Sequence, residues 1–181
     1  MQGAKMTQSL NTFHRALSEA KELLSCYDTL NGHNEIVPPD ALKKASLILA
    51  LTAWETYIED LITELFETKF SLVKGSTLGN FAERQLEERL KQFHNPDSRK
   101  TKHLFEEFFG IDITEGWKWN NTLPKQARTQ LNQWISIRGD AVHRAETDAS
   151  QPHLIRKDEL SKCIRFIEEL AKATDVAASK I

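Results

Sequence analysis

The chain has 181 residues, a hydrophobic content of 40% and a formal net charge of −2. This length and apolar content are enough for a substantial core, so we expect a single domain over residues 1–181. The slightly negative charge excludes a general attraction to nucleic acid, so any RNA contact must come from a local basic patch or a preorganised site.

The composition predicts an all-α protein, a helical bundle of five to six helices. Helix formers dominate, and no alternating pattern typical of strands persists. The periodicity predicts helices over residues 7–30, 39–70, 80–93, 98–109, 124–145 and 158–178. Asn80 to Glu83 resembles a capping box for the third helix, and Asp97 or Ser98 could cap the fourth, which Gly110 ends. No apolar run follows a basic start in this sequence, and the run Ala45–Ala53 is too short to cross a bilayer, so we expect a cytoplasmic protein without membrane contact. Cys26 and Cys163 lie on the apolar stripes of two expected helices, which predicts two reduced core residues.

The second expected helix carries an unusual carboxylate. From Ala45 to Trp54 this helix is apolar nearly all round, which predicts a position at the centre of the bundle. Glu55 lies one turn after Leu51, on the side expected to be buried. A carboxylate there needs a cation or a wet cavity, and we nominate Arg138 as the cation. A partly exposed glutamate at the rim of the helix is the open alternative.

Two tryptophans stand in the segment 111–121, for which the pattern predicts irregular structure. Trp117 and Trp119 have the aromatic rings that stack on unpaired bases in RNA-binding proteins. Aromatic residues on such a segment more often pack it onto the core, and we favour that interpretation.

The stretch Leu131–Arg144 combines an apolar helix face with groups suited to phosphodiester chemistry. Arg138 carries a permanent charge that binds phosphate oxygens, and His143 has the side chain best able to exchange protons near neutral pH. Asp140 is spaced to orient His143. Residues 138 and 143 are about 140° apart on an ideal helix, so we expect Gly139 to allow a kink or a helix end that brings both into one cleft.

The segment Arg138–His143 matches the Arg-x-x-x-x-His motif of HEPN domains (higher eukaryotes and prokaryotes nucleotide-binding). The apolar helix Ala45–Leu61 resembles the early helix of the RiboL-PSP type of that superfamily, and the resemblance spans roughly Leu10 to Ala178. Many members carry Asn directly after the arginine, where this chain has Gly139. The resemblance implies a metal-independent endoribonuclease without a cofactor, with paired motifs at a homodimer interface and a cyclic-phosphate product. It also implies a role in phage defence or in a toxin–antitoxin pair, with an antitoxin or another protein as partner.

These observations give a hypothesis in which the 2′-hydroxyl of single-stranded or structured RNA attacks the neighbouring phosphate. His143 acts as base or acid, Arg138 binds the scissile phosphate, and Asp140 orients His143. The open alternative is that Arg138 pairs with Glu55 as part of the scaffold and that His143 is an ordinary histidine at the rim. Arg144 is a second phosphate contact, and Glu55 belongs to the substrate-binding region through its pairing with Arg138. One motif is one proton-transfer group short of the full set, and a twofold dimer would supply the second.

Other functions are weighed against this one. The main alternative is a non-catalytic module that binds RNA or a protein and dimerises. It could use the densest basic cluster, although a solvated loop explains that cluster as well: Arg99, Lys100, Lys102 and His103. A purely structural dimerisation unit is a third possibility. The sequence argues against a metal enzyme, because its histidines and cysteines lack the spacing of metal ligands.

Overall fold

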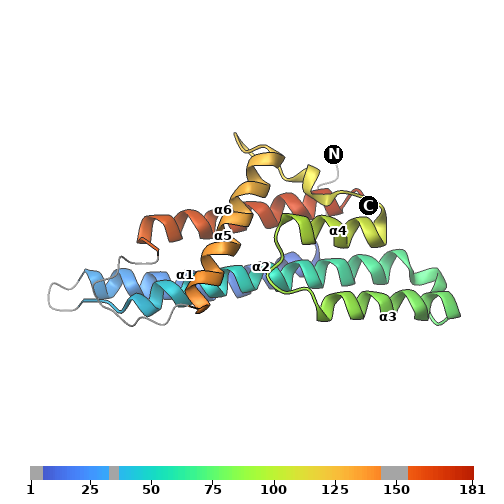
Figure 1. Ribbon diagram of the computed structural model, residues 1–181, viewed down its shortest axis with the longest axis horizontal. Helices are drawn as coiled ribbons and strands as arrows, with labels where there is room; N and C mark the ends of the chain where they lie inside the picture. Colours follow the sequence, from blue (N-terminus) through green and yellow to red (C-terminus); the bar gives the residue numbers. More distant parts are fainter. Residues whose placement is uncertain (1–5, 33–36, 144–154) are drawn as a thin grey trace.

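The computed structural model describes residues 6–32, 37–143 and 155–181. Within these ranges the chain forms six α-helices and two short 3₁₀ turns, and its only β pairing is one isolated bridge between Trp119 and Thr122. The elements in chain order are α1 Gln8–Asn31, α2 Asp40–Lys69, η1 Ser71–Val73, α3 Thr77–Lys91, α4 Ser98–Phe109, η2 Ile113–Gly116, α5 Pro124–His143 and α6 Lys157–Ala178. The predicted all-α fold is confirmed (Figure 1).

Helix α2 is the centre of the bundle, as predicted. It packs against α1, α4, α5 and α6. Figure 1 shows α1 and α2 side by side as a long hairpin, with α6 running along them and α5 crossing at a steep angle. The inward side chains of α2 include Leu51, Trp54 and Ile58, all with no exposed surface. Burial of each such side chain contributes about 1.5–3 kcal/mol, so α2 is the main source of hydrophobic stabilisation.

The start of α1 is held in place by α6 and by the C-terminal half of α2. Thr7 is the N-cap of α1, and its hydroxyl donates a hydrogen bond to the carboxylate of Asp175. The carboxylate of Glu64 on α2 accepts hydrogen bonds from the backbone N–H groups of Gln8, at 3.2 Å, and Ser9, at 3.0 Å. The first N–H groups of a helix have no partner inside it, so Glu64 satisfies donors that would otherwise depend on water.

Helix α3 begins three residues earlier than predicted. The N-cap is Ser76 and not Asn80, because the Ser76 hydroxyl accepts from the Gly79 N–H at 3.0 Å. Gly79 is required here by a close approach, since a Cβ on it would lie 2.1 Å from the carbonyl oxygen of Val73.

The two tryptophans of the segment before α5 belong to the core. Trp117 is fully buried and meets Trp54 edge to face, with ring centroids 5.9 Å apart. Trp119 is partly buried and packs on Phe166 at 5.7 Å. The favoured interpretation of this segment is confirmed, although part of it forms the turn η2.

The prediction of a buried thiol is right for one cysteine and wrong for the other. Cys163 on α6 is fully buried, and Cys26 on α1 is exposed. The fully buried positions of α1 all lie between Ser9 and Ala20, so the apolar stripe continues past the part of the helix that the bundle covers.

Candidate functional site

Arg138 lies on the side of α5 that faces the core. Ala127 and Leu131 are fully buried on this helix, and Arg138 continues the same stripe toward the C-terminal end. Its side chain is only 14% exposed, and its Nη1 donates to Oε2 of Glu55 at 2.8 Å. The predicted pairing of Glu55 with Arg138 is therefore confirmed, and the Glu55 side chain is 15% exposed.

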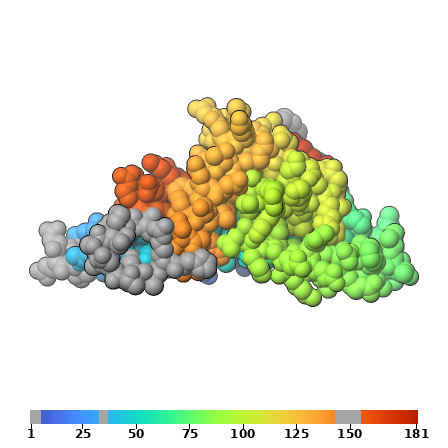
Figure 2. Space-filling view, viewed as in Figure 1, coloured from blue at the N-terminus to red at the C-terminus, as the bar shows by residue number. Residues whose placement is uncertain are grey.

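Three segments of the chain meet at this guanidinium. Besides Glu55, Nη1 donates to the side-chain oxygen of Asn95 in the connection between α3 and α4, and Nη2 donates to the hydroxyl of Thr52 on α2 at 3.1 Å. Figure 2 shows α5 (orange) and the start of α4 (yellow-green) side by side on one face of the molecule. We call Thr52, Glu55, His94, Asn95 and Arg138 the Arg138 cluster.

Burying the charged groups of the Arg138 cluster costs folding free energy. Desolvating two charges costs several kcal/mol, and a buried ion pair usually does no better than apolar residues of similar volume. In addition, the Nε–H of Arg138 is buried without a hydrogen-bond partner among the described residues. A buried donor left without an acceptor costs about 1–3 kcal/mol. A cluster that stabilises the fold so inefficiently is a candidate for a functional role.

The connection between α3 and α4 is anchored so that it presents two polar residues. Phe93 and Pro96 are buried on either side, and His94 and Asn95 are exposed between them. The indole Nε1 of Trp54 donates to the carbonyl of Pro96 at 3.1 Å, which ties the connection to α2. Asn95 has a φ of 51°, in the left-handed region that asparagine tolerates better than most residues.

His94 is the histidine that the described structure places at this cluster. Its Nδ1 lies 3.7 Å from Oε1 of Glu55, and its side chain is 73% exposed. Its backbone carbonyl accepts a hydrogen bond from Nζ of Lys100. Sequence reasoning missed His94 and Asn95, because nothing in a single chain shows that residues 94 and 95 fold back onto residue 138.

The motif helix differs from its prediction at Gly139. Helix α5 continues without a break to His143, so the expected kink is wrong. Glycine costs only about 1 kcal/mol relative to alanine inside a helix, and Ala141 beyond it is buried in the core. At 3.6 residues per turn, the backbone of residue 143 lies about 140° around the helix axis from residue 138.

The remaining residues of the predicted site are placed only in part. Asp140 is exposed on α5, one turn before His143. The side chain of His143 and the whole of Arg144 lie outside the described residues. The roles predicted for Asp140, His143 and Arg144 therefore stay predictions.

Comparison with known protein families decides the classification. The family model RiboL-PSP-HEPN matches residues 14–180. The chain belongs to the RiboL-PSP-HEPN family. The predicted resemblance, from Leu10 to Ala178, agrees with this range. No curated protein and no solved structure matches the chain.

The basic cluster of this RiboL-PSP-HEPN domain lies on α4 and not on a loop. Lys102 forms ion pairs with Asp112 at 2.8 Å and with Glu106 at 3.4 Å, and its hydrogen bond to Asp112 leads the interactions that raise its pKa. His103 lies 3.7 Å from the same Glu106. Part of the cluster's charge is thus balanced by carboxylates within the domain, and Arg99 and Lys100 remain on the exposed surface.

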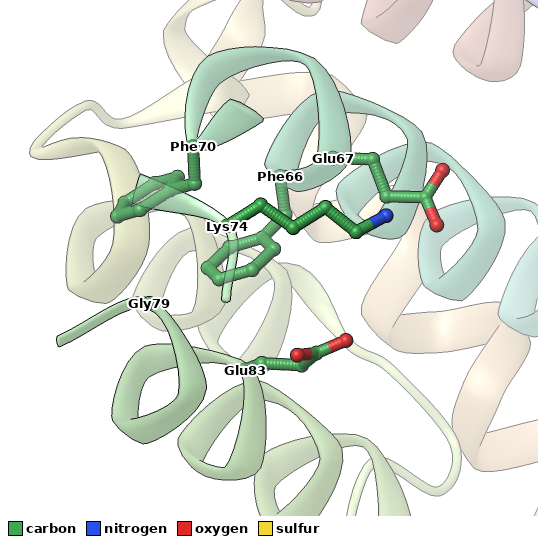
Figure 3. A pocket seen from close by; sticks show the side chains of 6 residues that line it. All are labelled: Phe66, Glu67, Phe70, Lys74, Gly79 and Glu83. Atoms are coloured by element: carbon green, nitrogen blue, oxygen red, sulfur yellow. The ribbon is translucent and has the colours of Figure 1, made fainter. Parts of the chain in front are cut away.

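The pocket drawn in Figure 3 does not coincide with the Arg138 cluster. It lies between the end of α2 and the start of α3, beside the stacked rings of Phe66 and Phe70, whose centroids are 4.4 Å apart. Its small volume, about 30 Å³, makes it an unsuitable site for a nucleotide. Among the described residues, no group of three or more His, Cys, Asp or Glu side chains is arranged to hold a metal ion. No helix of this part of the chain is long and apolar enough to span a membrane.

Proposed function

We propose that this RiboL-PSP-HEPN domain is a metal-independent endoribonuclease that cleaves RNA by attack of the 2′-hydroxyl. The observation that carries the proposal is Arg138, a cation fixed at the junction of three segments. A buried ion pair such as Arg138–Glu55 is weak evidence for a stabilising role, and the Nε–H of Arg138 has no hydrogen-bond partner among the described residues. Membership of a family associated with ribonucleases supports the same conclusion.

The proposed reaction assigns one task to each motif residue. His143 exchanges a proton with the 2′-hydroxyl or the leaving 5′-oxygen, and Asp140 orients His143. Arg138 stabilises the negative charge that builds up on the scissile phosphate, with Arg144 as a second phosphate contact. The products are a 2′,3′-cyclic phosphate and a 5′-hydroxyl. Glu55 belongs to the proposed binding region because it accepts a hydrogen bond from Arg138.

The test uses an end-labelled RNA and the same sequence with 2′-deoxyribose throughout, both in the presence of EDTA. We expect the wild-type protein to cleave the RNA, to leave the deoxy strand intact, and to give cyclic-phosphate ends. His143→Ala should slow cleavage about 100- to 10,000-fold, the usual contribution of a positioned acid or base. His14→Ala, on α1, is the matched control and should cleave normally. A wild-type protein that never cleaves RNA, or a His143→Ala variant that cleaves equally well, refutes the proposal.

We also propose a homodimer that brings two motifs close together. Sedimentation equilibrium at the concentration of the cleavage assay should show two chains per particle. A monomer that cleaves RNA would contradict a centre shared between subunits. We further propose that the protein acts in phage defence or as the toxin of a toxin–antitoxin pair. Expression of the wild-type protein, but not of His143→Ala, should then arrest growth of a bacterial host.

A second candidate function is a non-catalytic module that binds RNA or a protein. It is favoured by the number of partners already bound to Arg138, since Glu55, Asn95 and Thr52 occupy three of its five N–H groups. The exposed Arg99 and Lys100 would then carry RNA binding. Binding that is lost in Arg99→Glu/Lys100→Glu, unchanged in His143→Ala and never followed by cleavage would support this candidate.

A further inference from the structure

A groove lies between the turn η2 and the C-terminal end of α6, and Figure 1 shows the yellow segment that contains η2 beside the red end of α6. The groove consists of two hollows, with volumes of about 240 and 310 Å³, that share four lining residues: Gly116, Lys118, Ala177 and Lys180. These volumes are near the lower end of the range for ligand clefts, about 300–1,000 Å³. Gly116 lies directly against α6, since a Cβ on it would stand 2.4 Å from the Cβ of Ala177. We call the two hollows together the α6 groove.

The side chains of the α6 groove leave a local excess of positive charge. The carboxylates that line it are each paired with a cation: Asp112 with Lys102 at 2.8 Å, Glu115 with Arg128 at 2.8 Å and Glu169 with Lys172 at 2.9 Å. Lys118 and Lys180 are exposed, and neither has an ion-pair partner among the described residues. The groove therefore attracts anions locally, although the formal net charge of the chain is −2.

Trp119 adds an aromatic wall to the α6 groove. Its ring lines one hollow and packs against Phe166 of α6, with ring centroids 5.7 Å apart. Its backbone is fixed by the isolated bridge with Thr122, in which the N–H of Trp119 donates at 3.2 Å and that of Thr122 at 2.7 Å. The ring is thus held in one place and is only partly buried. A rigid ring beside uncompensated lysines is the combination with which proteins hold single-stranded nucleic acids.

We propose that the α6 groove binds single-stranded RNA. Trp119 stacks on one base, and Lys118 and Lys180 bind phosphates on either side of it. A single strand is favoured over a duplex because paired bases stack on one another and offer no free face to the indole. The inference rests on the proposed function, which makes RNA the ligand, and it deepens that function by naming where the substrate is held.

The α6 groove lies apart from the Arg138 cluster. It adjoins the segment that leads into α5, and from Pro124 to Arg138 this helix rises about 20 Å, at 1.5 Å per residue. A strand whose scissile phosphate lies at Arg138 therefore reaches the groove with nucleotides away from the cut. The groove contributes affinity and takes no part in the chemical step, so its loss should raise KM and leave kcat unchanged.

The experiment measures binding without cleavage. The probe is a labelled oligouridine of about 12 nucleotides, within the roughly 4–16 that single-strand sites cover, with 2′-O-methyl groups that prevent attack by the 2′-oxygen. Fluorescence anisotropy at several salt concentrations gives the affinity. We expect Lys118→Ala/Lys180→Ala to weaken binding and to reduce the slope of log K against log salt by about 1.4, at about 0.7 for each phosphate contact. The matched control Lys69→Ala/Lys74→Ala removes two exposed lysines near the end of α2 and should leave the slope unchanged.

Two substitutions at Trp119 distinguish stacking from packing. Trp119→Leu keeps an apolar contact with Phe166 and removes the aromatic ring. It should weaken binding of the probe about 5- to 150-fold, the usual effect of losing one stacked base. Trp119→Phe keeps a ring and should retain most of the affinity. Circular dichroism checks that both variants are folded.

The outcomes separate this inference from the proposed function. If the wild-type protein cleaves RNA and the groove variants bind the probe as tightly as it does, the ribonuclease stands and the assignment of the groove is wrong. The assignment is also overturned if Trp119→Leu and Trp119→Phe lose affinity equally, or if a polyglutamate peptide binds as tightly as the probe, which would make the groove a site for an acidic protein. If the wild-type protein binds the probe through the groove and never cleaves RNA, the ribonuclease fails and the RNA site stands.

Discussion

The ion pair between Glu55 and Arg138 offers a test that separates a scaffold from a catalytic centre. The test uses Glu55→Leu, Arg138→Met and the double variant. Each single change leaves one charge at a site that is about 85% buried in the intact pair. Breaking a fully buried pair costs about 3–5 kcal/mol, and the remaining exposure together with the hydrogen bonds to Asn95 and Thr52 reduces this to about 2–4 kcal/mol.

The double variant should be more stable than either single variant. It places two apolar side chains where the ion pair was, and such replacements are often neutral. We therefore expect a coupling of about 2 kcal/mol or more between the two positions. Urea denaturation followed by circular dichroism measures this coupling. In thermal denaturation the single variants should melt about 4–16 °C below the wild type, at about 2–4 °C per kcal/mol for a domain of this size. A coupling below about 0.5 kcal/mol would show that the pair is not an energetic unit.

The same variants also test whether Arg138 is needed for RNA cleavage. If the double variant is folded and no longer cleaves RNA, the charge of Arg138 is required for chemistry and not for folding. A double variant with wild-type stability and wild-type cleavage would refute the reasoning, because the ion pair would then have no part in the reaction.

Three further predictions concern stability and reactivity. Gly139→Ala should raise the free energy of unfolding by about 0.5–1 kcal/mol, since a Cβ there meets no atom within 4 Å. Gly79→Ala should lower it by about 1–3 kcal/mol, because its Cβ would collide with Val73. Urea denaturation measures both changes, and a change of the same sign in the two variants would contradict this reasoning. Partial burial alone would raise the pKa of Glu64, but the hydrogen bonds from the side chain and backbone of Ser9 and the backbone of Gln8 outweigh it and lower the pKa below 4.5. The wild type should therefore exceed Glu64→Gln in stability at neutral pH, and the difference should disappear as the pH falls below 4.5 through the folded-state pKa; a difference that persists at low pH would refute it. Burial raises the pKa of the Cys163 thiol, so a thiol reagent should label Cys26 in the native protein and Cys163 only after unfolding, whereas rapid native labelling of both would contradict the buried position.

The helices were predictable because each is specified by residues within it or directly beside it in the sequence. The apolar run of α2 specified the centre of the bundle, and Asp97 and Gly110 marked the two ends of α4, where the structure has a side-chain cap and a left-handed residue. The start of α3 was missed because Ser76 and Asn80 are both acceptable caps by type. The Ser76 hydroxyl also donates to the carbonyl of Val73, the same carbonyl that lies against Gly79, and this local turn fixes the start of α3 at Ser76.

The candidate site was predictable only where its residues broke a local pattern. Glu55 interrupted an apolar stripe and Arg138 continued one, and each therefore required the other. His94 and Asn95 broke no pattern, because polar residues before a proline are what a helix end normally contains. Their contact with α5 depends on how the whole α3–α4 connection is anchored, and no spacing within the sequence encodes that.

The continuity of α5 changes what the sequence motif means. Because Arg138 follows Ala127 by eleven residues, which is close to three full turns, it lies on the same inward stripe. The helix does not bend at Gly139, so the position of His143 diverges from that stripe. The closeness of the two residues in sequence therefore does not by itself bring them to one site within a subunit. What lies beside the guanidinium is Glu55, 83 residues away in the chain, and through Glu55 the imidazole of His94.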